Sequence, residues 1–267
     1  MKQRIITAIV AAAFFIPFVI YGKWPFVLLV YAMATVALYE LLRMGKQPLF
    51  SFDGILSVLL LWLILFPSKY MHVIAQTGFS KLELVYMIVL LFLAYMVVTK
   101  NRFTFEQAGF HILSAIYVGI GFYYFIETRN APDVGITYIL YALFLIWATD
   151  SGAYFIGRAF GKHKLWPEIS PNKTVEGALG GVLCAAVVAV LFFFFSNIGL
   201  GLWRLMMSTV VLSVFGQIGD LVESAYKRHY GVKDAGKILP GHGGILDRFD
   251  SLLFVLPLIH FLKMMAG

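Results

Sequence analysis

Residues with reactive side chains recur at helical spacing inside an apolar stretch that ends near residue 157. An α-helix would bring five side chains of this stretch onto one face: Trp147, Asp150, Ser151, Tyr154 and Arg158. A charge within a lipid bilayer costs about 2.5–3.5 kcal/mol, so we expect Asp150 to face a polar cavity. The alternative is a packing role, in which Asp150 pairs with a lysine.

A second helical face carries two carboxylates, a hydroxyl and an amine: Asp220, Glu223, Ser224 and Lys227, with Arg228 directly after them. Acids one turn apart repel each other unless a cation lies between or beside them. Carboxylate oxygens together with substrate phosphates are the ligands with which proteins hold Mg2+. A solvated helix end with internal salt bridges is the alternative.

Two connecting segments add groups that could bind phosphate. Ser170 and Pro171 predict the start of a helix, with Lys173 and Thr174 near its first turn, where free amides attract phosphate. The alternative there is an ordinary helix cap with a solvated lysine. The other segment contains a glycine-rich loop and leads into the last apolar run; its candidate residues are Lys233, Lys237, Gly241, His242, Gly243, Gly244, Asp247, Arg248 and Asp250. Acids at a helix start also serve as plain caps, and a lone histidine is more often structural.

Together these segments hold acids at positions 150, 220, 223, 247 and 250, and bases at 173, 227, 228, 233, 237 and 248. Carboxylates can hold a metal ion while basic side chains hold phosphates. The pattern therefore predicts metal-assisted phosphoryl or nucleotidyl transfer that involves a lipid. Residues 157–163 match the P-loop pattern poorly, and the zinc-protease motif and the nucleophile elbow of α/β-hydrolases are missing, which argues against those chemistries.

The composition is that of a membrane protein. Hydrophobic residues make up 61% of the chain and charged residues 13%, with a mean hydropathy of +0.85. A soluble protein is nearer to 25% charged. Since about 20 apolar residues form one span, we predict an all-α, polytopic membrane protein with about nine transmembrane helices, near residues 5–21, 25–42, 54–71, 82–99, 104–126, 134–157, 175–196, 202–222 and 246–265.

Lysine and arginine positions predict the orientation. With the N-terminus in the cytoplasm, fifteen of the 21 basic residues, among them Lys2 and Arg4, fall inside and six, among them Lys263, fall outside. The polar loops 158–174 and 223–245 then both face the cytoplasm. We therefore expect residues 1–130 to form a scaffold of transmembrane spans with possible oligomer contacts, and residues 131–267 to form the catalytic region. The net charge of +7 fits loops on the cytoplasmic side, and no nucleic-acid partner is expected.

Residues 147–251 resemble the phosphatidate cytidylyltransferase family (CDP-diacylglycerol synthases). The run from Ser224 to Asp250 is similar to the family's signature, with one departure, Tyr226, where an aliphatic residue or Phe is expected. The motifs around Asp150 and around residues 170–177 are also similar to the family's. The resemblance implies CTP and phosphatidic acid as substrates, Mg2+ as cofactor, and a place in the plasma membrane with the active site facing the cytoplasm. A second cation such as K+ and a homodimer are left open.

The resemblance also implies roles for individual residues. The catalytic set is Asp150, Asp220, Glu223, Asp247 and Asp250, with Asp220 and Asp247 as first metal ligands and Asp150 and Asp250 as further ligands. The substrate-binding set is Ser170, Lys173, Thr174, Ser224, Lys227, Arg228, Lys233, Lys237, His242, Gly243, Gly244 and Arg248. The alternatives are a sister transferase that uses another lipid and a cation- or proton-coupled transporter. A transporter would place its acids near the middle of the bilayer rather than at one face.

Overall fold

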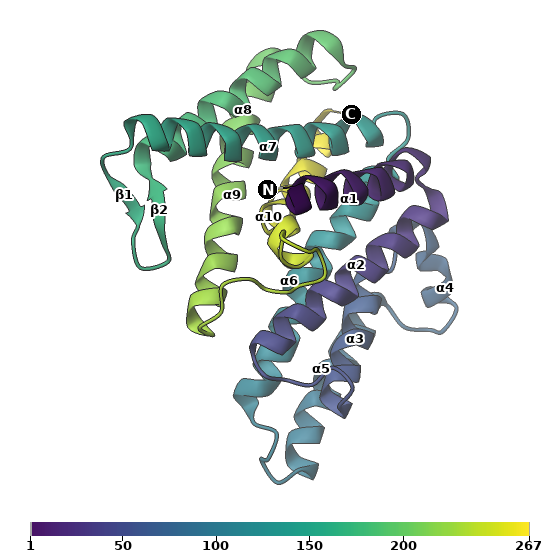
Figure 1. The fold of residues 1–267 in the computed structure, drawn as a ribbon. Coiled ribbons are helices and arrows are strands. Elements are labelled where there is room, and N and C mark those ends of the chain that lie inside the picture. The colour runs from purple at the N-terminus through teal and green to yellow at the C-terminus, as the bar shows by residue number, and fades with distance from the viewer. Residues whose placement is uncertain (1, 267) are drawn as a thin grey trace. The chain divides into compact units, whose positions relative to one another are not determined.

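The computed structural model describes residues 2–266, and within them the regular secondary structure is helical apart from one short hairpin (Figure 1). The elements are α1 (Lys2–Tyr21), α2 (Lys23–Met44), α3 (Phe52–Leu65), η1 (Ser68–Tyr70), α4 (Met71–Ala75), α5 (Lys81–Val98), α6 (Phe105–Arg129), α7 (Gly135–Phe160), β1 (Lys164–Trp166), β2 (Ser170–Thr174), α8 (Val175–Phe195), α9 (Leu202–His229) and α10 (Leu246–Ala266). The predicted all-α class is confirmed.

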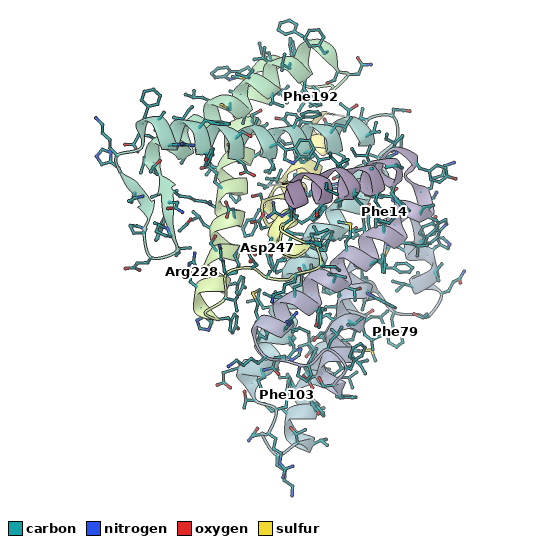
Figure 2. All side chains as sticks on the ribbon, viewed as in Figure 1. Phe14, Phe79, Phe103, Phe192, Arg228 and Asp247 are labelled. Carbon is teal, nitrogen blue, oxygen red and sulfur yellow. The ribbon has the colours of Figure 1, made fainter. Side chains whose placement is uncertain are left out.

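Within the described residues, six helices are long and apolar enough to cross a membrane, and a bent pair gives up to seven. The six are α2, α5, α6, α7, α8 and α9. Apolar side chains such as Phe14 and Phe79 are exposed, as expected for surfaces that meet lipid (Figure 2). The count of nine spans is not confirmed, although each predicted segment contains a helix. The side chains of Lys2, Arg4 and Lys263, which entered the charge tally, lie outside the described residues.

The third predicted segment, residues 54–71, is broken rather than continuous. Helix α3 ends at Leu65, and the chain turns by 89° into η1 and α4. The Lys81 amine donates hydrogen bonds to the carbonyl oxygens of Ile64 and Phe66, at 2.7 and 3.1 Å, so the carbonyls that the helix end leaves free are satisfied. Pro67 lies within the break and has no N–H to continue a helical ladder.

The chain forms two compact units. The first contains the residues up to Glu127 together with Ala235–Leu246, and the second contains Thr128–Asp234 together with the residues from Asp247 onward. The predicted catalytic region, residues 131–267, therefore covers parts of both units. Its assignment to catalysis stays a prediction.

In the first unit, polar groups are buried together between helices. Ser57 of α3 lies 2.7 Å from Nδ1 of His111, whose Nε2 lies 3.0 Å from the Asp53 carboxylate. Around them, Phe92 and Phe103 pack against the His111 ring. Burial without a partner would cost each of these polar groups several kcal/mol in lipid, so they satisfy one another.

In the second unit, helices α7 and α8 approach closely along a stripe of small residues. A Cβ atom added at Gly152 would lie 2.6 Å from Sγ of Cys184, and one added at Gly181 would lie 2.7 Å from the carbonyl oxygen of Thr149. Small residues are how membrane helices reach such contacts. Helix α9 joins them through a hydrogen bond of 2.9 Å between the hydroxyls of Thr149 and Ser213.

Replacing Gly152 by alanine is expected to destabilise this packing. The added methyl group would meet Cys184 and the carbonyl of Gly180, and overpacking of this kind costs about 1–3 kcal/mol. The measurement is the midpoint of thermal unfolding in detergent. Gly201→Ala is the matched control, since a Cβ there has nothing within 4 Å. Equal midpoints for the two variants would contradict the close α7–α8 contact.

Two local predictions are wrong. Residues 170–174 do not open a helix but form β2, which pairs with β1 through Trp166 with Ser170 and Lys164 with Thr174. The helix starts only at Val175, where the Thr174 hydroxyl caps it by accepting from the amide of Gly177 at 3.1 Å. The other correction concerns the loop predicted at residues 223–245, because α9 remains helical as far as His229.

Candidate active site

A cavity of about 460 Å³ in the second unit brings three of the sequence motifs together. Asp150, Tyr154 and Arg158 line it from α7, Lys173 from β2 and Asp220 from α9. Its volume is within the range of small-molecule sites, about 300–1,000 Å³. Residues that lie up to 70 positions apart in the sequence thus share one polar cavity, as the expected position of Asp150 requires.

Close helix packing explains why these side chains meet. A Cβ at Gly157 of α7 would lie 3.3 Å from Cα of Gly177 in the first turn of α8, so the end of β2 is held beside α7. Likewise a Cβ at Gly219 of α9 would lie 2.7 Å from the carbonyl oxygen of Asp250 in α10. Gly157 directly precedes Arg158, and Gly219 directly precedes Asp220. The close packing at these two glycines therefore sets the distances between the charged side chains.

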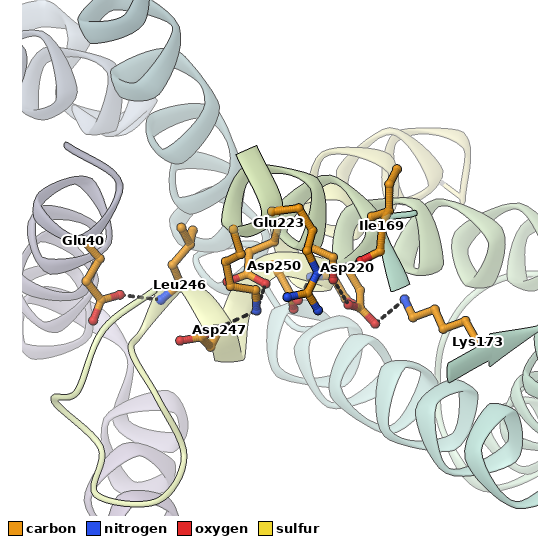
Figure 3. Close-up of polar contacts among 12 residues, drawn as sticks. Glu40, Ile169, Lys173, Asp220, Glu223, Leu246, Asp247 and Asp250 are labelled. Carbon is orange, nitrogen blue, oxygen red and sulfur yellow. Dashed lines mark hydrogen bonds and ion pairs between the residues drawn. The ribbon is translucent and has the colours of Figure 1, made fainter. Parts of the chain in front are cut away.

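An ion pair spans the cavity wall. Nζ of Lys173 lies 2.5 Å from the Asp220 carboxylate, with both side chains about one-third exposed or less (Figure 3). Asp150 and Asp250 lie within electrostatic range of Asp220, and Arg248 lies within that range of Asp150. Among the described residues, no three His, Cys, Asp or Glu side chains are arranged closely enough to hold a metal ion by themselves.

A second ion cluster is more deeply buried. Lys227 pairs with Glu223 one turn before it on α9, and its Nζ lies 2.9 Å from Oδ1 of Asp247 at the start of α10 (Figure 3). The side chains of Glu223 and Asp247 are 1% and 5% exposed. Because both acids already share the Lys227 cation, this cluster ties α9 to α10.

Arg228 contacts the hairpin. Its Nε donates a hydrogen bond of 3.1 Å to the carbonyl oxygen of Ile169, in the turn between β1 and β2. Lys227, Arg228 and Lys233 also line a separate, shallow hollow of about 360 Å³. Ser224 lies 3.4 Å from the Asp220 carboxylate, at the edge of hydrogen-bonding distance.

Other predicted residues lie outside the cavity. Trp147 and Ser151 are exposed on α7 and do not line it, and neither does Ser170. Lys237, His242, Gly243 and Gly244 belong to the first unit, in the segment Ala235–Leu246. For these four residues, as for the rest of the predicted substrate-binding set, the role stays a prediction.

Sequence reasoning missed two residues with notable contacts. Gln217 lines the cavity, and its side-chain amide donates to the carbonyl of Ala178 at 3.2 Å. Its position three residues before Asp220 was the available signal. Glu40 is the one acid in the apolar stretch 25–42 and is 2% exposed. The argument that singled out Asp150 applies equally to Glu40.

Comparison with known proteins covers nearly the whole chain. The model of the cytidylyltransferase family matches residues 2–265. The phosphatidate cytidylyltransferase of Bacillus subtilis (strain 168) is 57% identical over 262 residues, which are 98% of this chain and 97% of the relative. Those of Staphylococcus haemolyticus (strain JCSC1435) and Staphylococcus aureus (strain COL) are 50% and 46% identical, each over 98% of both chains.

Proposed function

We infer the activity from one premise, that the chain belongs to the cytidylyltransferase family. It transfers the cytidylyl group of CTP to phosphatidic acid and so forms CDP-diacylglycerol and pyrophosphate. The observation that carries this proposal is the cavity in which Asp150, Lys173 and Asp220 meet, because it combines acids for a cation with a base for phosphate. The high identity to relatives named phosphatidate cytidylyltransferase supports the choice of substrates.

In the proposed reaction, a phosphate oxygen of phosphatidic acid attacks the α-phosphorus of CTP. A phosphorus–oxygen bond forms there as the bond to the β-phosphate oxygen breaks, and pyrophosphate leaves with that electron pair. The nucleophile is already an anion, so no strong base is needed. The task of the protein is alignment and charge neutralisation. Lys173 and Arg158, which line the cavity, would hold phosphate oxygens, and Gln217 would add an amide.

The carboxylates of the site suit a divalent cation. Mg2+ takes oxygen ligands and is often bound through one or two carboxylates together with substrate phosphates. Asp150 and Asp220 line the cavity, so these two would hold Mg2+ together with substrate phosphates, while Asp250 lies within their electrostatic range. When bound, Mg2+ would neutralise charge on the phosphates. Asp247 was also predicted as a ligand, but its pairing with Lys227 favours a structural role. K+ and a homodimer stay predictions.

We also propose that the site opens to the cytoplasm, where CTP is found, and that the protein lies in the cell membrane. The distribution of basic residues supports this orientation.

The test is pyrophosphate release by the detergent-solubilised protein. Release is expected only when CTP, phosphatidic acid and Mg2+ are all present, and EDTA should reduce it to the level seen without lipid, because the carboxylates then hold no cation. Thin-layer analysis with labelled CTP identifies the lipid product. Transfer to a different lipid phosphate in preference to phosphatidic acid would favour the sister transferase, and full activity in EDTA would contradict the metal.

A further inference from the structure

The segment that precedes α10 is tied to α2 by one buried carboxylate, that of Glu40. Its Oε1 accepts a hydrogen bond from the amide of Ile245 at 3.1 Å, and its Oε2 accepts one from the amide of Leu246 at 2.9 Å (Figure 3). Leu246 is the first residue of α10. The carboxylate therefore caps this helix from a distant part of the chain, where the N–H groups of a first turn otherwise have no partner.

Two glycines of the same segment leave room for this carboxylate. A Cβ atom added at Gly236 or at Gly244 would overlap the carboxylate of Glu40. Neither glycine has a positive φ, so backbone conformation does not require glycine at these positions. Close approach to Glu40 explains both of them, and it gives Gly244 a reason to be glycine that is independent of any ligand.

Between these two glycines the chain makes an ordered turn. The amide of Leu239 donates to the carbonyl of Gly243 at 2.9 Å, and the amide of His242 donates to the carbonyl of Leu239 at 2.8 Å. Gly241 and Gly243 have φ values of 78° and 86°, which favour glycine. Gly236 and Gly244, at the two ends of the turn, therefore both pack against Glu40. Lys237 lies exposed between them.

We propose that Glu40 is a positioning residue for the transfer reaction. It is not among the residues that line the cavity of Asp150, Lys173 and Asp220, and it acts by holding the segment 235–246. That segment carries Lys237 and His242 and continues by a single peptide bond into Asp247. A carboxylate is well suited to this place, because it accepts two amides at once and interacts favourably with the positive end of the helix dipole. The proposal rests on the proposed function.

The first test compares Glu40→Gln with Glu40→Ala. Glutamine keeps the shape but turns an N–H donor toward one of the two amides. A displacement of about 1 Å can cost about 100-fold in rate, so we expect kcat per folded enzyme to fall on the order of tenfold for Gln and further for Ala. The control is Asp53→Asn, another buried acid of the first unit, which should lower stability but keep kcat. Glu40 variants that lose stability and keep kcat would overturn the proposal.

The second test uses the contact between Gly236 and Glu40, and its first variant keeps Glu40. Gly236→Ala should lower kcat, while Gly109→Ala, where a Cβ has nothing within 4 Å, should not. In a Glu40→Ala background the methyl group at residue 236 has room, so Gly236→Ala should cost little more. Losses that multiply in the double variant would contradict the contact. If Glu40→Ala fails to fold, Glu40→Asp, whose side chain is shorter by one methylene group, serves as the background instead.

A third readout is independent of catalysis. Release of the segment should speed tryptic cleavage after Lys237 in Glu40→Gln and Gly236→Ala, relative to cleavage after the exposed Lys164 of the hairpin. Wild-type protein that makes no product from CTP and phosphatidic acid would refute the proposed function, but it would leave intact the conclusion that Glu40 anchors the segment 235–246. If the wild-type protein is active and the Glu40 variants show unchanged kcat and unchanged cleavage, the positioning role of Glu40 is refuted and the proposed function stands.

Discussion

Replacing Asp220 by asparagine is expected to lower kcat by about 1,000-fold, which is the upper range for loss of one electrostatic contact to a reacting group. Asparagine keeps the size of the side chain but removes the negative charge that faces Lys173 and lies near Asp150 and Asp250. Since Asp220 is one-third exposed, the fold should tolerate the change. The measurement is pyrophosphate release under saturating CTP and phosphatidic acid.

The control for this variant is Glu168→Gln, an exposed acid in the turn of the hairpin. It removes the same charge from the same unit and should leave kcat within a factor of about two, as surface substitutions usually change little. Near-normal turnover by Asp220→Asn, with the control also active, would refute the role of Asp220. Equal thermal midpoints for the two variants would establish that the loss is chemical rather than structural.

Replacing Lys227 by methionine is expected to destabilise the protein by about 3–5 kcal/mol, the usual cost of breaking a buried ion pair. The variant would leave the carboxylates of Glu223 and Asp247 buried together without their shared cation. The measurement is unfolding by SDS titration in mixed micelles, followed by tryptophan fluorescence. Lys233→Met, at an exposed position, is the matched control.

A double variant separates the loss of the cation from other effects of methionine. Glu223→Gln removes one of the two buried charges, so Glu223→Gln with Lys227→Met should be more stable than Lys227→Met alone. If the double variant were less stable than either single variant, the cluster would not be held by charge. Because the cluster joins α9 to α10, activity should fall together with stability in Lys227→Met.

Regular, local patterns in the sequence predicted much of this fold. Each apolar run produced a helix, because lipid leaves the backbone no other partner than itself. The helical spacing after Asp150 placed Tyr154 and Arg158 on the cavity wall, and the spacing after Asp220 placed Glu223 and Lys227 on neighbouring turns of α9. The meeting of Asp150, Lys173 and Asp220 was expected from their shared polarity.

Features that depend on tertiary contacts could not be predicted in the same way. The end of α3 depends on the amine of Lys81, which lies 15 residues or more beyond the carbonyls that it satisfies. Ser170 and Pro171 resemble a helix start, but pairing with β1 gives their segment a strand instead. The reason for glycine at position 244 lies in Glu40, about 200 residues earlier in the chain.

Chemical labelling of this protein will report on the contact between α7 and α8. Cys184 is the sole cysteine of the sequence, and its sulfur lies against Gly152, where even a methyl group has no room. An alkylating reagent bound there would push apart α7, which carries Asp150, and α8, which directly follows the strand that carries Lys173. A cysteine-free variant is therefore the appropriate background for attaching probes elsewhere in the molecule.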